Sequence, residues 1–365
     1  MYNLDMKVSI LRESKIDIKG REIENRVALT PELISELKKR CPSAEIFVEA
    51  GAGNKIGFID SDYQYAGAKI VPHDDALSAD LVLGVKETRI EDFPKLKNNI
   101  FMSYQHFAES RERTDKAINT GATFICFETM EIQKDGRPYF PCLAPMSEAA
   151  ARILVRHADV YALLKSKIIS SGLSGTNFKK LKVTILGAGN VGKTAALEFA
   201  SRGYEVHLID RKNIKKLKES LCGSYYVVSS MYTSGRSPEK LITKELLNTM
   251  IEGGCVYPVD IDQGGGVLGA VQTSIFDLFD LPIIEGTKVS CFAPPNIPSL
   301  GAKTTSEALG SAILPYVIEI VNLGLDKAAE KNSTIRSGIN IRAGKIVHPG
   351  LASVFLFKAS DTFSF

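Results

Sequence analysis

The sequence lacks three features: paired cysteines, a long apolar run and an excess of charge of one sign. Its six cysteines are scattered and none forms a C-x-x-C pair: Cys41, Cys126, Cys142, Cys222, Cys255 and Cys291. This spacing argues against both a metal site and a disulfide framework, so we expect no bound metal, and reduced thiols in a cytoplasmic protein. No apolar run approaches the ~20 residues that span a bilayer, and residues 1–7 do not read as a signal peptide.

The charge balance argues against two classes of partner. A net charge of +3 over 365 residues gives no electrostatic reason to bind nucleic acid or an anionic membrane surface. The apolar content of 44% and charged content of 24% are ordinary for a globular protein. The length suffices for two domains, each with its own core.

The clearest motif is G-x-G-x-x-G, which follows an apolar run and precedes a helical pattern: Gly187, Ala188, Gly189, Asn190, Val191 and Gly192. Gly187 permits a tight turn, Gly189 lets the backbone approach a pyrophosphate, and Gly192 allows close packing of helix on strand. The helix N-terminus adds N–H groups and a partial positive charge. A second apolar strand, Glu205 to Ile209, ends on Asp210, where an acid is placed to accept ribose hydroxyls. This order predicts a dinucleotide site.

The basic pair Arg211 and Lys212 leaves NADP open, because it would accept a 2′-phosphate. Asp210 would repel that phosphate, so NAD is the preferred cofactor.

Strands and helices alternate along residues 6–130, which predicts a parallel sheet covered by helices. The later segments predict a helix from Ser147 to Leu164 with Ser147 as its N-cap, and a helix from Thr305 to about Val321 that returns to the first domain. Further expected elements are a basic helix 212–221, a strand 225–228, a helix 244–251 and a strand 255–261. The predicted fold is α/β, with two Rossmann-like domains and parallel sheets. A dinucleotide-binding domain, 141–302, is inserted in a discontinuous substrate domain, 1–140 and 303–365.

Three basic or titratable side chains lie in segments where α/β proteins commonly bind their ligands. Arg26 precedes a predicted helix that begins with a proline, where its guanidinium could bind both oxygens of a carboxylate. Lys86 and His106 follow the ends of apolar strands, the edge where ligands gather in parallel sheets. Lys86 would bind a carboxylate or polarise a carbonyl, and His106 would shuttle a proton. A solvated arginine, a strand-end lysine in water and a histidine satisfied by backbone remain open readings.

Two loops of the second half carry further candidates. Asp260 and Asp262 fall on one face at the end of a predicted strand, and two adjacent carboxylates should raise the pKa of one of them. Asn296 lies in the proline-braced loop Pro294 to Pro298. The alternatives are a polar turn with flexible glycines and a loop that the prolines merely shape.

Taken in order, these segments resemble the alanine dehydrogenase family, which includes the transhydrogenase alpha subunit and, more distantly, lysine-forming saccharopine dehydrogenase. The matching segments are 25–31, 48–53 with Gly57 and Phe58, 66–68, 85–87, 104–108, 145–148, 261–265 and 295–298. The resemblance covers almost the whole chain.

The resemblance implies a role for each matching residue. Arg26 and Lys86 resemble the pair that binds the substrate carboxylate and carbonyl, and His106 resembles the general acid/base. Asp262 resembles the second catalytic carboxylate. The remaining positions resemble residues that line cofactor or substrate: Asn296, Met146 and Ser147. The implied reaction is oxidative deamination of an L-amino acid, with alanine and pyruvate the leading pair, by hydride transfer to NAD. The implied assembly is a homo-oligomer.

Three departures from the family keep alternatives open. The segment after Asp210 is short, as in saccharopine dehydrogenase, so a strand–helix pair beside the adenine site is missing. Asp260 stands where a small apolar residue is usual, and Pro258 replaces an acid. Asp260 would read a cationic substrate tail or pair with a local Lys or Arg. A saccharopine- or opine-type dehydrogenase and a non-catalytic binding subunit are therefore rival readings.

Overall fold

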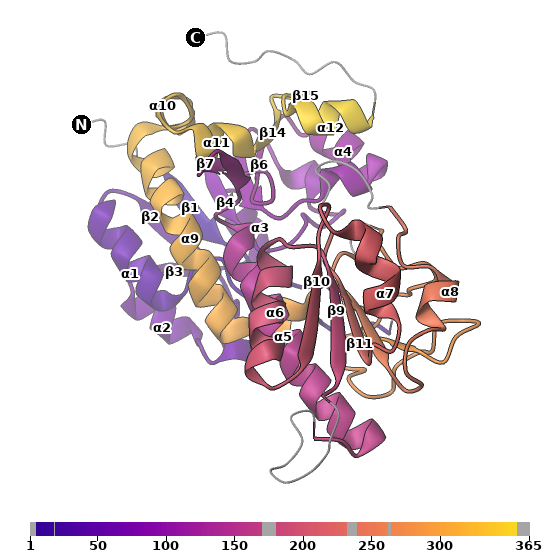
Figure 1. Ribbon diagram of the computed structural model, residues 1–365. Helices are drawn as coiled ribbons and strands as arrows, with labels where there is room; N and C mark the ends of the chain where they lie inside the picture. Colours follow the sequence, from indigo (N-terminus) through magenta and orange to yellow (C-terminus); the bar gives the residue numbers. More distant parts are fainter. Residues whose placement is uncertain (1–4, 18, 170–179, 232–238, 262–263, 356–365) are drawn as a thin grey trace. The chain divides into compact units, whose positions relative to one another are not determined.

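The computed structural model describes residues 5–17, 19–169, 180–231, 239–261 and 264–355. The chain divides into two compact units (Figure 1). Unit 1 comprises Met1–Met146 with Ala302–Phe365, and unit 2 comprises Ser147–Gly301. The unit boundaries therefore fall within six residues of the predicted domain limits at 140 and 302.

Unit 1 is built on an eight-stranded sheet of order β15-β14-β6-β5-β4-β1-β2-β3. The six strands from β6 to β3 are parallel, and β14 and β15 extend the sheet antiparallel. The strand bounds are β1 Lys7–Ile10, β2 Glu45–Glu49, β3 Lys69–Val71, β4 Leu81–Leu83, β5 Ile100–Ser103, β6 Thr123–Cys126, β14 Ile339–Arg342 and β15 Lys345–Ile346. A separate hairpin joins β7 Ile132–Lys134 to β8 Arg137–Tyr139.

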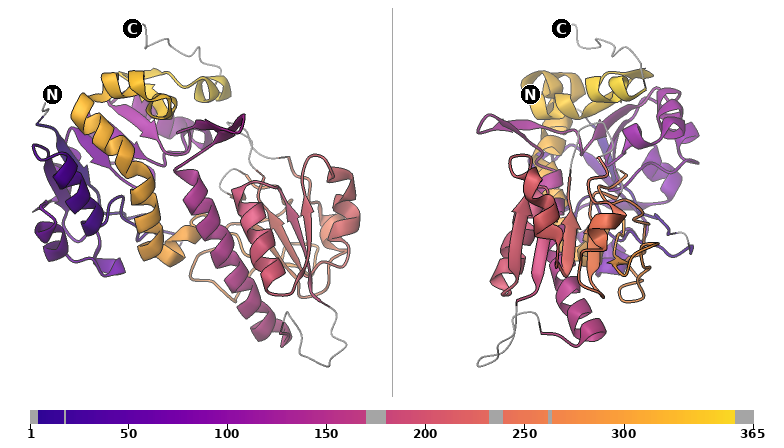
Figure 2. Two further views of the ribbon diagram at one scale, coloured as in Figure 1. Left: turned by 60° about the vertical axis from the view of Figure 1, so that its left-hand side comes forward. Right: turned by 45° about the vertical axis from the view of Figure 1, so that its right-hand side comes forward.

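Helices cover both faces of this sheet, as the views of unit 1 in Figures 1 and 2 show. One core contains side chains of α1, α2, α9, α10 and α11, and a second contains side chains of α3, α4 and α12. Alternate strand residues face the two cores: Leu81 and Leu83 enter the first, and Val82 enters the second. The helix bounds are α1 Pro31–Arg40, α2 Asp60–Tyr65, α3 His73–Leu77, α4 Arg111–Ile118, α9 Ala302–Leu323, α10 Leu325–Lys331, α11 Ser333–Gly338 and α12 Pro349–Val354.

Unit 2 contains a parallel five-stranded sheet of order β10-β9-β11-β12-β13. The strands are β9 Lys182–Leu186, β10 Glu205–Ile209, β11 Tyr226–Ser229, β12 Cys255–Pro258 and β13 Ser290–Cys291. Helices α5 Leu143–Tyr161 and α6 Asn190–Ser201 cover one face, and α7 Leu217–Leu221 and α8 Lys244–Leu247 cover the other. In the described part of the chain β10 is an edge strand, which fits the missing strand–helix pair inferred after Asp210.

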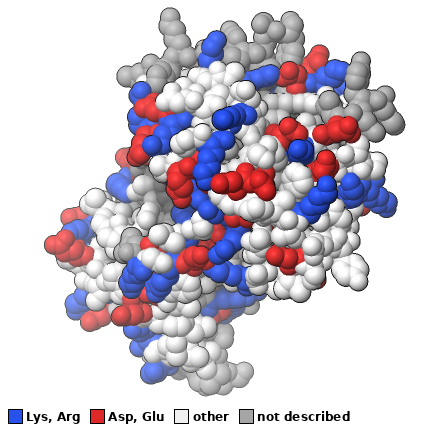
Figure 3. Space-filling model, turned by 180° about the vertical axis from the view of Figure 1, so that it is seen from behind, with Lys and Arg blue, Asp and Glu red and all other residues white. Residues whose placement is uncertain are grey.

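The predicted α/β class with parallel sheets is thus confirmed. No helix in the described ranges is long and apolar enough to cross a membrane. Acidic and basic side chains are interspersed on the face drawn in Figure 3.

Several sequence-based boundaries are wrong. The helix expected at 244–251 ends at Leu247. Helix α5 begins at Leu143, so Ser147 lies inside the helix rather than at its N-cap. The preceding proline does not prevent this start, because Pro145 lies in the first turn, where the missing N–H has no helical partner. Strand β12 ends at Pro258, so Asp260 follows the strand instead of lying on its face. The predicted basic helix is shorter, with only Leu217–Leu221 in α-helical form.

Candidate active site

Four chemically active side chains of unit 1 follow neighbouring strands of its sheet. Glu13 follows β1, Lys86 follows β4, His106 follows β5 and Glu128 follows β6. Because β1, β4, β5 and β6 are parallel neighbours, their carboxyl ends meet at one edge of the sheet. The sequence prediction that Lys86 and His106 lie at a common edge therefore agrees with the strand order.

His106 is held through its ring by Glu87. Its Nδ1 lies 2.9 Å from Oε1 of Glu87, and Lys15 contacts both oxygens of that carboxylate at 3.1 and 3.2 Å. A carboxylate only accepts hydrogen bonds, so Nδ1 carries the proton and Nε2 is left to exchange protons with a ligand. Burial acts to lower the pKa of His106, but the hydrogen bond and charge of Glu87 raise it above its ordinary value.

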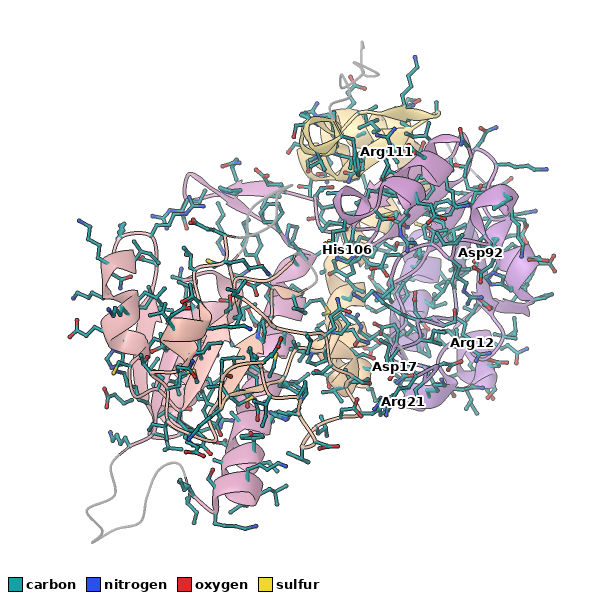
Figure 4. All side chains as sticks on the ribbon, turned by 90° about the vertical axis from the view of Figure 1, so that its right-hand side faces the viewer. Arg12, Asp17, Arg21, Asp92, His106 and Arg111 are labelled. Atoms are coloured by element: carbon teal, nitrogen blue, oxygen red, sulfur yellow. The ribbon has the colours of Figure 1, made fainter. Side chains whose placement is uncertain are left out.

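The backbone at His106 is also fixed. His106 has a φ of 48°, in the left-handed region, where histidine occurs more often than most residues. Its N–H donates to Oε1 of Glu128 at 2.7 Å. The side chain of the buried Gln105 donates to Thr88 and Ser103, both at 2.8 Å. Figure 4 shows His106 within unit 1.

Arg26 is buried, with 2% of its surface exposed, and is clamped by Glu24. Its Nε and Nη2 donate to the two carboxylate oxygens at 2.8 and 2.6 Å, and Nη1 lies 3.1 Å from Sδ of Met146. Glu24 therefore occupies the Nε/Nη2 edge of the guanidinium. A substrate carboxylate can form a bidentate pair only with the Nη1/Nη2 edge beside Met146. The open reading of Arg26 as a solvated surface residue is wrong.

Lys86 is also buried, with 7% exposed, so it is not a strand-end lysine in water. Its charge acts on two neighbouring carboxylates. Burial would raise the pKa of Glu87, but Lys86, His106 and Lys15 hold it well below its usual range. Burial would also raise the pKa of Glu24. The charge and hydrogen bonds of Arg26, together with the charge of Lys86, outweigh this effect and lower it.

Glu13 differs from these carboxylates. Its Oε1 accepts hydrogen bonds from the backbone N–H groups of Val85 and Lys86, at 2.5 and 3.3 Å. Burial and the nearby negative charge of Glu24 raise its pKa to about 7. Glu13 therefore exchanges a proton with solvent in the neutral pH range.

A pocket of about 260 Å³ opens beside Glu13 and Arg26. It is lined by residues that follow β1, residues that follow β2, and the segment before α1: Arg12, Glu13, Glu24, Asn25, Arg26, Gly51, Ala52, Asn54 and Lys55. In Figure 4, Arg12 lies with Asp17 and Arg21 below His106. None of the lining residues follows β5, the strand that precedes His106.

The glycine motif of unit 2 forms the predicted turn between β9 and α6. Gly187 has a φ of 107°, and a Cβ on Gly192 would lie only 1.8 Å from the carbonyl oxygen of Gly187. Both positions therefore require glycine. A Cβ on Gly189 would meet nothing within 4 Å, and Gly189 is exposed at the start of α6 without a side-chain cap. This open space at a helix N-terminus fits the pyrophosphate of a dinucleotide.

Asp210 ends β10 beside this turn. Its Oδ1 accepts from the N–H groups of Lys212 and Asn213 at 2.8 and 3.2 Å, and Asn213 accepts from the N–H of Asp210. These contacts fix the carboxylate while using only Oδ1, so Oδ2 is available to accept from a ribose hydroxyl. Arg211 and Lys212 are exposed.

Asp260 is buried in unit 2 and joins the end of β11 to the glycine-rich loop that follows Asp260. Its Oδ2 accepts from Oγ of Ser229 at 2.6 Å and from the N–H groups of Met231 and Gly266, both at 3.2 Å. Burial raises its pKa despite these hydrogen bonds. In the described ranges no lysine or arginine forms an ion pair with it, so the predicted local pairing is not found.

The remaining predicted residues are placed as follows. Asn296 is 1% exposed in the turn before a 3-10 helix, Ile297–Gly301. Ser147 is half-buried within α5. Asp262 lies outside the described residues, so its role stays a prediction.

The sequence alone predicts no role for Glu13, Glu24, Glu87 or Glu128. A signal was present for two of them. Glu128 follows strand β6 just as Lys86 and His106 follow theirs, and Glu87 adjoins Lys86. Nothing in the sequence alone indicates that Glu24 turns back onto Arg26.

Comparison with known proteins gives a consistent result. The family "Alanine dehydrogenase/PNT, N-terminal domain" matches residues 12–150. The family "Alanine dehydrogenase/PNT, C-terminal domain" matches residues 210–349. An alanine dehydrogenase of Halomonas elongata is 30% identical over 96% of this chain and 97% of its own length. One of Mycobacterium tuberculosis is 30% identical over 95% of this chain and 96% of its own.

Solved structures agree with these sequence matches. An L-alanine dehydrogenase matches with a TM-score of 0.82 and 29% identity, over 96% of this chain and 99% of that one. A transhydrogenase from Sinorhizobium meliloti matches with a TM-score of 0.74 over 94% of this chain and 99% of its own. At 20% identity, this second likeness concerns the fold alone.

Proposed function

Because the chain belongs to the alanine dehydrogenase/PNT family, we propose that it is an NAD-dependent dehydrogenase that deaminates an L-amino acid, with alanine and pyruvate as the leading pair. The observation that carries the proposal is the arrangement in unit 1. A buried arginine, a buried lysine and a histidine held by a carboxylate follow one another along one edge of the sheet.

The substrate carboxylate binds to the Nη1/Nη2 edge of Arg26, beside Met146, and Lys86 stabilises the oxygen or nitrogen on the neighbouring carbon. Glu24 keeps the guanidinium in one orientation by occupying its other edge. Because Arg26 is already fixed, its side chain loses less conformational entropy when a ligand binds.

His106 moves the protons. Glu87 fixes the proton on Nδ1, so Nε2 accepts a proton from the amino group or from water that attacks the imine, and returns it in the reverse direction. NAD, when bound, supplies the hydride acceptor at its nicotinamide. The turn of Gly187, Gly189 and Gly192 and the carboxylate of Asp210 are the residues of unit 2 that would bind it.

Asp262 as second catalytic carboxylate, and Met146, Ser147 and Asn296 as lining residues, remain part of the proposal. Unit 1 is the substrate domain and unit 2 the dinucleotide-binding domain in this reading. A cytoplasmic homo-oligomer is proposed from the family alone.

The test is NADH oxidation followed by absorbance, with pyruvate plus ammonia and, separately, with pyruvate plus lysine. We expect turnover with ammonia, and we expect His106→Ala to abolish it while NADH binding is retained. Turnover with pyruvate plus lysine, and none with pyruvate plus ammonia, would instead indicate an opine-type enzyme. A fully active His106→Ala variant would remove His106 from the mechanism.

A further inference from the structure

We propose that the pocket beside Arg26 binds a carboxylate on the substrate side chain, so that the substrate class extends to four- and five-carbon dicarboxylic amino acids and 2-oxo acids. This inference rests on the proposed function, because it requires the α-carboxylate to bind at Arg26. It concerns unit 1 alone.

The position of the pocket suits a side chain rather than the reacting carbon. Its lining residues follow β1 and β2, whereas His106 follows β5, two strands from β1 in the sheet order. Arg26 lines the pocket, and Glu13 links it to Lys86 through the backbone N–H of that lysine at 3.3 Å. A substrate held at Arg26 and Lys86 therefore has its reacting carbon toward His106 and space for a longer side chain on the other side.

The size of the pocket agrees with a small metabolite. Its volume of about 260 Å³ is slightly below the roughly 300 Å³ at which pockets for drug-sized ligands begin. The methyl group of alanine would leave most of this space to water, which the polar lining would hydrogen-bond.

The charges of the lining favour an anion. Arg12 and Lys55 are 44% and 47% exposed, and both pair with a single carboxylate, Glu22. Burial, and then repulsion by Arg12, lower the pKa of Lys55. Arg26 adds a third cation, while Glu24 is committed to Arg26 and Glu13 is partly protonated near neutral pH. A carboxylate that enters the pocket meets two cations sharing one counter-ion.

The contact of Asp260 with a cationic substrate tail concerns unit 2 and stays a prediction. The Oδ2 of Asp260 accepts three hydrogen bonds, from Ser229 at the end of β11, from Met231 just after it and from Gly266, and only 6% of the residue is exposed. Its buried Oδ1 has no hydrogen-bond partner among the described residues.

The experiment compares pyruvate, oxaloacetate and 2-oxoglutarate as substrates of the full chain, with ammonia and NADH. The variants are Arg12→Met, Lys55→Met and their combination. The side-chain ion pairs of Arg12 and Lys55 are with the partly exposed Glu22, and the backbone N–H of Arg12 binds Glu49 independently of its side chain, so the fold should tolerate both changes. Lys69→Met is the control, because Lys69 is an exposed lysine of unit 1 that pairs with Glu45.

We expect the double variant to raise KM for at least one dicarboxylic acid roughly tenfold or more, with pyruvate changed less than about twofold and Lys69→Met without effect. Turnover of pyruvate without turnover of either dicarboxylic acid would overturn the inference and leave the proposed function standing. The same holds if the double variant loses activity equally toward all three substrates.

Absence of turnover with every substrate would count against the proposed function instead. In that case calorimetric titration with 2-oxoglutarate in the presence of NADH decides the inference. Binding that the double variant loses supports the pocket, and binding that it keeps, or that the unmodified chain lacks, refutes it.

Discussion

Replacing Glu87 by glutamine removes the negative charge that holds His106 and keeps the size of the side chain. In the structure Glu87 accepts from Nδ1 of His106 at 2.9 Å and is contacted by Lys15. The variant loses the charge that raises the pKa of His106, while burial and the charge of Lys86 continue to lower it. The pKa of His106 should therefore fall.

The size of the fall follows from the strength of one hydrogen bond to a charged group. Such a bond contributes about 1.5–3 kcal/mol, and one pH unit corresponds to ~1.4 kcal/mol. Losing it should lower the pKa of His106. In the direction of deamination the histidine must be unprotonated to accept a proton, so the acidic limb of the kcat/KM profile should move to lower pH.

The assay is kcat/KM for alanine across pH 5–9 with saturating NAD, together with an NMR titration of the His106 ring. Glu45→Gln is a matched control, because Glu45 is an exposed carboxylate of unit 1 paired with Lys69. An acidic limb that stays in place, or that moves to higher pH, would show that Glu87 does not set the protonation of His106.

Three further outcomes follow from the structure. Glu24→Gln should leave the buried charge of Arg26 unpaired and lower the free energy of unfolding of unit 1 by about 3–5 kcal/mol, measured by urea unfolding. Gly189→Ala should raise the Kd for NADH and leave the melting temperature unchanged, whereas Gly192→Ala should lower the melting temperature, both followed by calorimetry. Burial lowers the pKa of His157 from 6.5 to about 4, so unit 2 should lose about 3 kcal/mol as pH falls from about 6.5 to 4; His157→Gln should reduce this dependence in urea unfolding.

The fold was predictable where local patterns are strong. The bounds of strand 205–209 match those expected, because Asp210 follows its apolar residues, and the helix expected to begin with a proline after Arg26 begins at Pro31. The N-terminus of α5 was misjudged because the serine after Pro145 is a good cap in isolation, yet the helix starts at Leu143. Packing against the core, rather than capping, decides that boundary.

The site was predictable only in its cations and its histidine. Lys86 and His106 could be inferred because they stand alone at the ends of apolar strands. Their acidic partners could not be assigned, since whether Glu24 faces Arg26 or solvent depends on tertiary structure. Asp260 likewise has partners that the sequence does not reveal. Its Oδ2 joins Ser229 at the end of β11 to Gly266, a contact that depends on tertiary structure.

The charges of unit 1 predict that a proton and an anionic substrate bind together. Arg26, Lys15 and Lys86 lie among three carboxylates, those of Glu24, Glu87 and Glu128. An added substrate carboxylate would give this cluster a net negative charge. His106 and Glu13 both have pKa values raised above their ordinary ones, and Glu13 titrates near 7. A negative charge at Arg26 should raise both pKa values further, so binding of an anionic substrate is expected to draw a proton into this cluster.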